Sequence, residues 1–217
     1  MKIKGIIFDL DGTLLDTIED IASILNSVLK SHNFPAHDTK AYRGFIGGGF
    51  ENTVRVILPE DKQEKEIVSE LVLEAKQKYL ENWINKTRPF AGITDLLKNL
   101  ISKNLKLAVF TNKQDDVAKK SVEHFFSQIP FDPVMGLKPD SIRKPDPHGA
   151  LQIARNWGIP PEGILFVGDM HIDLITAQNA AMKGIGALWG YQDNQIIKKY
   201  NAFAFIDHPI QLLDYLA

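Results

Sequence analysis

Short apolar runs, the stronger of which lack polar alternation, are the feature that most limits how this chain folds. An uninterrupted apolar run is typical of a strand that is buried on both faces, and such strands occur mainly in parallel sheets. Glycine, proline or polar residues bound the runs, which cover residues 3–8, 105–111, 132–136, 163–169 and 184–190. We therefore predict a parallel sheet made from these segments.

Segments with helical spacing separate the apolar runs. They cover residues 93–104, 115–126, 147–158 and 173–181, and the third ends at Gly158, a residue suited to a helix C-terminus. Strands that alternate with helices in this way are typical of an α/β fold with a doubly wound parallel sheet and a Rossmann-like core.

One block of the chain breaks the alternation. Between residues 16 and 83 we find no convincing strand, whereas apolar residues recur at helical spacing, with Thr17 as a plausible helix cap. These residues are Ile18, Ile21, Ala22, Leu25, Val28 and Leu29, and later Ile67, Leu71, Ala75 and Tyr79. We expect residues 16–87 to form an all-helical cap domain, inserted into a Rossmann-like catalytic core of residues 1–15 and 88–217.

The composition excludes several classes of function. The 217 residues include no cysteine, so disulfides, cysteine-ligated zinc and thiol catalysis are excluded. The net charge of −2, with scattered Lys and Arg, gives no basic surface for nucleic acid. The apolar run near the N-terminus is too short for a membrane span or a signal core. We expect a cytoplasmic protein with neither nucleic acid nor membrane as a partner.

Two carboxylates stand where the first predicted strand ends. Asp9 and Asp11 follow the apolar run, and Gly12 comes directly after them. Ligands of open α/β sheets bind beyond the carboxyl ends of the strands, and residues two apart in an extended chain face the same side. Asp and Gly are also ordinary turn residues, so this pair alone leaves both interpretations open.

The second predicted strand ends in groups that suit an anion. Thr111, Asn112 and Lys113 offer a hydroxyl, an amide and an ammonium in succession. We predict that these three residues contribute to substrate binding at the same edge of the sheet.

A later strand end adds further carboxylates. Asp169 follows the run at residues 163–169, and Asp173 falls on the first turn of the next predicted helix. Crowded carboxylates repel one another unless a cation joins them, and oxygen ligands without Cys or a His pair favour Mg²⁺. We predict a Mg²⁺ site formed by Asp9, Asp11, Asp169 and Asp173.

The chain contains two candidates for a fixed lysine. Lys-Pro-Asp occurs at Lys138 and again at Lys144, and only the second copy continues into Pro147 at a predicted helix start. Proline is well tolerated in the first helical turn and fixes the direction of the chain there. We choose Lys144, although a lone KPDP is also compatible with a solvent-facing turn.

Four of these segments, in order, resemble the motifs of the haloacid dehalogenase-like phosphatases. They are DLDGT, TN, KPDP and GDMHID, and a helical insertion follows the first. The resemblance implies that Asp9 is the nucleophile and Asp11 the general acid and base. It also implies phosphate binding by Thr111 and Lys144, and a metal site that includes Asp169.

The resemblance also implies that Asp173 completes the metal environment. The chain departs from many relatives just after Asp169, where Met170 and His171 replace a small polar residue. We expect His171 to be a loop residue and not a metal ligand.

A glycine-rich stretch at residues 42–55 is similar to the cap loop of phosphoglycolate phosphatases. It lacks the Gly-Lys-Ser/Thr of nucleotide-binding loops and follows no strand, so a nucleotide role is rejected. By this resemblance Gly48 and Arg55 are substrate-binding residues, and Arg43 is the other arginine able to hold a substrate carboxylate. An ordinary turn between helices, with solvated arginines, is the competing interpretation.

The sequence thus predicts a Mg²⁺-dependent phosphatase that acts on a small phosphate ester. The resemblance implies 2-phosphoglycolate as the substrate and an aspartyl phosphate as the intermediate. Three alternatives remain at this point: a phosphosugar mutase similar to β-phosphoglucomutase, a pyrophosphatase of the same family, and a catalytically silent binding protein of this fold.

Overall fold

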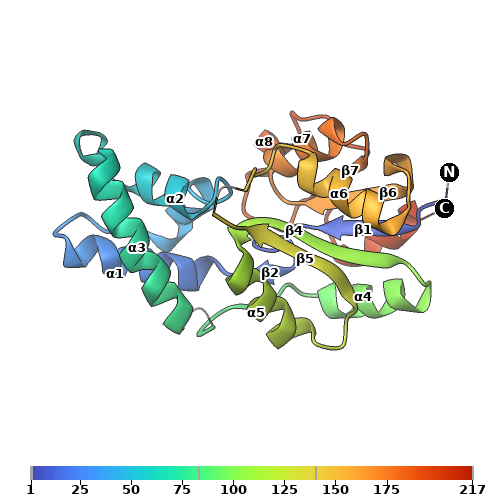
Figure 1. Ribbon diagram of the computed structural model, residues 1–217, viewed down its shortest axis with the longest axis horizontal. Coiled ribbons are helices and arrows are strands. Elements are labelled where there is room, and N and C mark those ends of the chain that lie inside the picture. Colours follow the sequence, from blue (N-terminus) through green and yellow to red (C-terminus); the bar gives the residue numbers. More distant parts are fainter. Residues whose placement is uncertain (1, 83, 140, 217) are drawn as a thin grey trace. The chain divides into compact units, whose positions relative to one another are not determined.

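The chain forms two compact units. The computed structural model describes residues 2–82, 84–139 and 141–216. One unit comprises Met1–Leu15 and Pro89–Ala217, and the other comprises Asp16–Arg88. The first is built around a parallel sheet and the second is built from helices, so we call them the sheet unit and the helical unit (Figure 1).

The sheet unit contains six strands in the order β5-β4-β1-β6-β7-β8, and all neighbouring strands are parallel. This order places β1 in the interior of the sheet, with the winding direction reversing beside it, and it confirms the predicted doubly wound α/β fold. The strands are β1 (Gly5–Phe8), β4 (Lys106–Gln114), β5 (Phe131–Leu137), β6 (Ile164–Gly168), β7 (Lys183–Ala187) and β8 (Ala204–Ile206).

Helices cover both faces of this sheet (Figure 1). On one face lie α4 (Ile93–Ser102) and α5 (Asp115–Phe126), and on the other lie α6 (His148–Trp157) and α7 (His171–Asn179). The unit also contains η3 (Pro161–Gly163), α8 (Asn194–Ile197) and η4 (Pro209–Tyr215).

Alternation along the strands separates two hydrophobic cores. Ile6 and Phe8 of β1 pack with α4 and α5, whereas Ile7 between them packs with α6. Because successive side chains point to opposite faces, a strand covered on both faces must be apolar throughout. This explains why the predicted runs lack polar alternation. Strand β7 ends at Ala187, so it is shorter than the apolar run at residues 184–190. Strand β8 is not among the predicted strands; it has three residues and is only partly buried.

The helical unit is built from α1 (Ile18–Ser31), α2 (Phe50–Ile57) and α3 (Lys65–Asn82), with two short 3₁₀ helices, η1 (Thr39–Gly44) and η2 (Glu60–Lys62). Helix α3 packs against both α1 and α2. The two-residue strands β2 (Leu15–Asp16) and β3 (Arg88–Pro89) pair with each other. Thr17 occupies the predicted N-cap position of α1, without a side-chain capping hydrogen bond.

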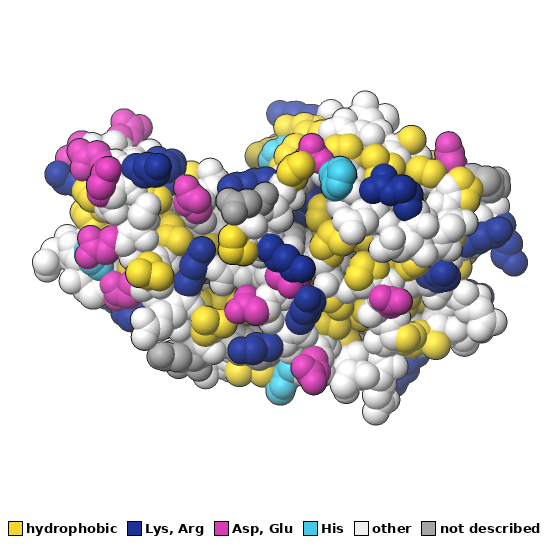
Figure 2. All heavy atoms as spheres, viewed as in Figure 1, with side chains coloured by type: hydrophobic (Ala, Val, Ile, Leu, Met, Phe, Trp, Pro, Cys, Tyr) yellow, Lys and Arg dark blue, Asp and Glu magenta, His cyan; other side chains and the backbone are white. Residues whose placement is uncertain are grey.

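Charged side chains of both signs share the face that Figure 2 shows. On the face shown in Figure 2, Lys and Arg side chains are interspersed with Asp and Glu side chains. Among the residues that the structure describes, no helix combines the length and the apolar character needed to cross a membrane.

Asp20, in the first turn of α1, connects the two ends of the helical unit. The residue is only 3% exposed. It accepts hydrogen bonds from the backbone N–H of Lys86, at 2.9 Å, and of Thr87, at 2.8 Å, and from the Thr87 hydroxyl at 2.8 Å. One buried side chain therefore ties the entry of the unit to the segment by which the chain leaves it.

We expect Asp20→Ala to lower the free energy of unfolding by about 2–3 kcal/mol, because it leaves two backbone N–H groups without their acceptor. Urea denaturation followed by circular dichroism measures the change. The neighbouring exposed residue provides a control, since Glu19→Ala should change the free energy by less than about 0.5 kcal/mol. Equal midpoints for the two variants would contradict the structural role of Asp20.

Candidate active site

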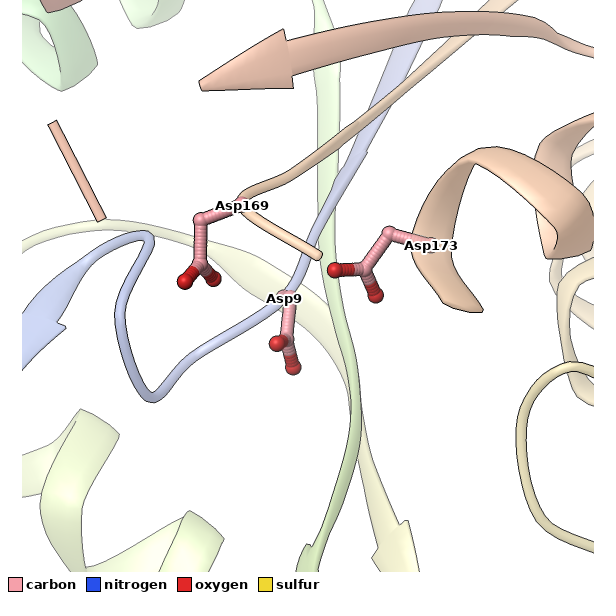
Figure 3. A group of neighbouring side chains, drawn as sticks. All are labelled: Asp9, Asp169 and Asp173. Atoms are coloured by element: carbon pink, nitrogen blue, oxygen red, sulfur yellow. The ribbon is translucent and has the colours of Figure 1, made fainter. Parts of the chain in front are cut away.

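Three buried carboxylates meet beyond the carboxyl ends of β1 and β6 (Figure 3). One carboxylate oxygen from each of Asp9, Asp169 and Asp173 lies within 4.8 Å of the other two. Asp9 follows β1, Asp169 follows β6, and Asp173 lies in the first turn of α7. Because β1 and β6 are neighbouring parallel strands, they end at the same edge, and the Asp9 N–H continues the pairing by donating to Val167 O at 2.9 Å.

Lys144 places its ammonium among these carboxylates. Its Nζ lies 2.6 Å from Asp173 Oδ1 and 2.9 Å from Asp9 Oδ1, and the residue is only 2% exposed. Burial disfavours the charged lysine, but the attraction of Asp173 and Asp9 outweighs it and raises the pKa of Lys144 above its ordinary value. Both carboxylate contacts therefore favour the charged form of this lysine.

One lysine does not balance three carboxylates. Burial, together with the neighbouring charges of Asp173 and Asp9, raises the pKa of Asp169 well above its ordinary value. Burial also raises the pKa of Asp173, to about 6, although Lys144 acts in the opposite direction. A divalent cation at this position would relieve the repulsion that favours protonation of both groups.

The donor atoms at this position are all carboxylate oxygens. Asp9 Oδ1 is buried and lies 2.9 Å from the Lys144 ammonium. Hard divalent cations take oxygen ligands, carboxylates among them. The donor set of Asp9, Asp169 and Asp173 therefore fits a hard divalent cation such as Mg²⁺.

Asp169 is held from two sides. Thr13 Oγ1 donates to Asp169 Oδ1 at 2.9 Å, and the backbone N–H of Tyr191 donates to Asp169 Oδ2 at 2.8 Å. Gly12 has φ +90°, and a Cβ there would overlap the Asp169 carboxylate. The glycine of the first motif thus provides both the turn and the space for a carboxylate from another strand.

Asp11 does not belong to the group of three carboxylates. Lys113 donates to both of its oxygens, at 2.9 Å and 3.1 Å. The predicted general acid and the predicted anion-binding lysine are therefore partners in one ion pair. The ammonium of Lys113 thus pairs with a carboxylate of the chain itself.

Asn112 holds the backbone of Lys144. Its Oδ1 accepts from the Lys144 N–H at 2.9 Å, and its Nδ2 donates to Lys144 O at 3.2 Å. Thr111 is buried beside it, and its hydroxyl accepts from the Lys113 N–H at 3.2 Å. Asn112 of the TN motif thus orients Lys144 of the KPDP motif. The spacing of the two motifs in the sequence did not indicate this contact.

Lys138, the competing lysine, lies elsewhere. Its side chain is 65% exposed, and its ammonium lies 3.9 Å from Asp115. The choice of Lys144 over Lys138 therefore agrees with the geometry of the carboxylate cluster.

The predicted substrate residues of the helical unit lie in three places: Gly48 precedes α2, Arg55 is in the last turn of α2, and Arg43 is in η1. Gly48 stands between Gly47 and Gly49, which both have positive φ. Arg55 donates to Gln63 O at 3.0 Å and lies 3.8 Å from Glu51, whereas Arg43 is exposed. Arg55 thus has contacts within its own unit, and the roles of Gly48, Arg55 and Arg43 toward substrate stay predictions.

The haloacid dehalogenase-like hydrolase family model matches residues 6–187 of this chain, which include both strands of the carboxylate cluster and Lys144. The chain belongs to this family. A phosphoglycolate phosphatase of Aquifex aeolicus is 35% identical over 188 residues, which are 87% of this chain and 86% of that protein. An N-acetylmuramic acid 6-phosphate phosphatase of Pseudomonas putida is 29% identical over 98% of this chain and 95% of that protein.

The family also accounts for the fold. The crystal structure of a putative phosphoglycolate phosphatase from Lactobacillus delbrueckii subsp. bulgaricus matches with a TM-score of 0.93 and 30% identity. The match covers 100% of this chain and 99% of that one. With its fold, its family and its relatives in agreement, this haloacid dehalogenase-like protein is a phosphoric monoester hydrolase.

Lys144→Ala should lower kcat by about a hundredfold or more, because it removes the ammonium that lies between Asp9 and Asp173 and that we predict to bind phosphate. Hydrolysis of an aryl phosphate measures the loss. Lys138→Ala is the matched control, since it removes an exposed lysine from the same Lys-Pro-Asp context. It should retain parent activity within about twofold. A larger loss for Lys138→Ala would show that the wrong lysine had been chosen.

Proposed function

We propose that this protein is a Mg²⁺-dependent phosphatase that hydrolyses a small phosphomonoester, most simply 2-phosphoglycolate, through an aspartyl phosphate on Asp9. The observation that carries the proposal is the buried Asp9 carboxylate, whose Oδ1 lies 2.9 Å from the Lys144 ammonium and which is grouped with the carboxylates of Asp169 and Asp173. That arrangement suits a nucleophile that shares its site with a cation. Several relatives named phosphoglycolate phosphatase support the choice of substrate.

In the proposed first step, an oxygen of Asp9 bonds to phosphorus as the ester oxygen leaves. Phosphoryl transfer depends mainly on positioning and on neutralisation of charge, so a weakly basic carboxylate can act as nucleophile. Asp11 donates a proton to the departing alkoxide. Lys144 and the Thr111 hydroxyl hold the phosphate oxygens as charge redistributes.

In the proposed second step, water attacks the phosphorus of the aspartyl phosphate. Asp11 removes a proton from this water, and the Asp9 carboxylate is released together with inorganic phosphate. Lys113 keeps the Asp11 carboxylate in place through its two contacts, and Asn112 does the same for the Lys144 backbone.

The metal would be held by Asp9, Asp169 and Asp173. When bound, Mg²⁺ would neutralise the carboxylates and the phosphate so that two anions can approach each other. The sequence also predicts Asp11 as a metal ligand, and this assignment stays a prediction. Its carboxylate is paired with Lys113, and we propose for it a proton-transfer role.

Asp9→Asn should reduce turnover by about a thousandfold or more, because an amide of the same volume does not attack phosphorus. Steady-state hydrolysis of phosphoglycolate and of an aryl phosphate measures the effect. Asp207→Asn, an exposed change in the same unit, serves as the control and should leave both rates unchanged. Activity of Asp9→Asn within tenfold of the parent would rule out Asp9 as the nucleophile.

A second candidate substrate follows from the comparisons, because two relatives that match nearly the whole chain are named N-acetylmuramic acid 6-phosphate phosphatase. The two substrates differ greatly in size, so a single pocket should not serve both equally well. Phosphoglycolate also carries a second anion, its carboxylate, for which we propose Arg55 or Arg43; Arg55 contacts Gln63 and Glu51, whereas Arg43 is exposed.

We predict a kcat/KM for phosphoglycolate at least about tenfold above those for N-acetylmuramic acid 6-phosphate, glucose phosphates and pyrophosphate. A phosphate-release assay over this panel with Mg²⁺ makes the measurement. The reverse order for the amino sugar would favour the second candidate. Isomerised sugar phosphate without release of phosphate would instead indicate a mutase.

A further inference from the structure

The segment after β7 contacts several parts of the site. Residues 189–192, Trp-Gly-Tyr-Gln, follow β7 and precede α8, and no catalytic motif includes them. We call this segment the brace loop.

The brace loop holds Asp169 and the turn that follows Asp9. The backbone N–H of Tyr191 donates to Asp169 Oδ2 at 2.8 Å. The indole Nε1–H of Trp189 donates to Thr13 O at 3.0 Å, and the Thr13 hydroxyl donates to Asp169 Oδ1. The loop, the turn and the carboxylate thus form one closed set of hydrogen bonds.

Gln192 extends these contacts to the start of α7. Its Oε1 accepts from the His171 N–H at 2.7 Å, and its Nε2 lies 2.7 Å from His171 Nδ1. His171 stands between Asp169 and Asp173 in the chain, so one side chain fixes the segment that connects two of the clustered carboxylates.

The brace loop is itself anchored at both ends. The Leu188 N–H donates to Ile206 O of β8 at 2.9 Å, and Asp193 caps α8 by accepting from the Gln195 N–H at 2.7 Å. A Cβ at Gly190 would overlap the Asp169 side chain, so the loop backbone packs directly against that carboxylate. A displacement of the loop would therefore displace Asp169.

We propose that the brace loop sets the position of Asp169 relative to Asp9 and thereby the affinity of the carboxylate cluster for its divalent cation, with Trp189 and Gln192 as positioning residues. This inference rests on the proposed cation site. Groups that hold a metal ligand in place commonly change metal affinity by 10–100-fold when they are removed.

Two substitutions remove the polar contacts and keep an apolar side chain at each position. Trp189→Phe keeps an aromatic ring but loses the indole N–H, and Gln192→Met keeps the length but loses both polar atoms. Gln195→Met is the matched control, because Gln195 is exposed and lies on α8 three residues further along. The shift of melting temperature over a series of Mg²⁺ concentrations gives an apparent Kd without substrate.

Both brace variants should bind Mg²⁺ about tenfold or more weakly than the parent, with KM for an aryl phosphate at saturating Mg²⁺ unchanged. Their melting temperatures in EDTA should stay within about 4 °C of the control, as expected for the loss of one hydrogen-bonding group. The control should bind Mg²⁺ as the parent does.

Two other results would overturn the inference in distinguishable ways. If the parent binds Mg²⁺ and the brace variants bind it equally well, the loop has no positioning role and the proposed function stands. If Mg²⁺ does not change the melting temperature of the parent, the proposed cation site fails and the brace inference fails with it.

Discussion

Repulsion among three buried carboxylates is the constraint on which the sheet unit depends. Asp9, Asp169 and Asp173 lie within a few ångströms of one another at the edge of the sheet, where little water can screen them. Lys144 offsets part of their charge, and a divalent cation is the simplest group able to offset the rest. An arrangement that costs stability in this way is typical of a catalytic site.

The strands and loops around this cluster hold the three carboxylates close together despite their repulsion. Strands β1 and β6 are buried on both faces and pair along their whole length, so their ends are held in register. The loops beyond them add specific hydrogen bonds rather than apolar packing. Asn112 holds the Lys144 backbone, and the brace loop holds Asp169. The register of β1 and β6 therefore brings Asp9 and Asp169 to the same edge of the sheet. The hydrogen bonds from the loops then orient the Asp169 carboxylate and the Lys144 backbone.

Much of the fold and part of the site could be predicted from the sequence. The apolar runs identified five of the six strands of the main sheet. Four of them, β1, β4, β6 and β7, are mostly buried, as expected for strands covered on both faces, whereas β5 is only partly buried. The Asp9, Asp169 and Asp173 cluster was predictable because each residue directly follows a recognisable strand or begins the next helix. Asp11 also follows β1, and only the tertiary structure shows that Lys113 of β4 pairs with its carboxylate.

What the sequence by itself determined is which segments are buried strands and which polar side chains stand at their ends, since both depend on neighbours along the chain. Only the tertiary structure decided the partners of those side chains. Thr13 and Asp169 are 156 positions apart, and the second support of Asp169 is a backbone N–H, which every residue except proline has. No local pattern encodes such a contact, because it exists only after separate loops have been brought to the same edge of the sheet.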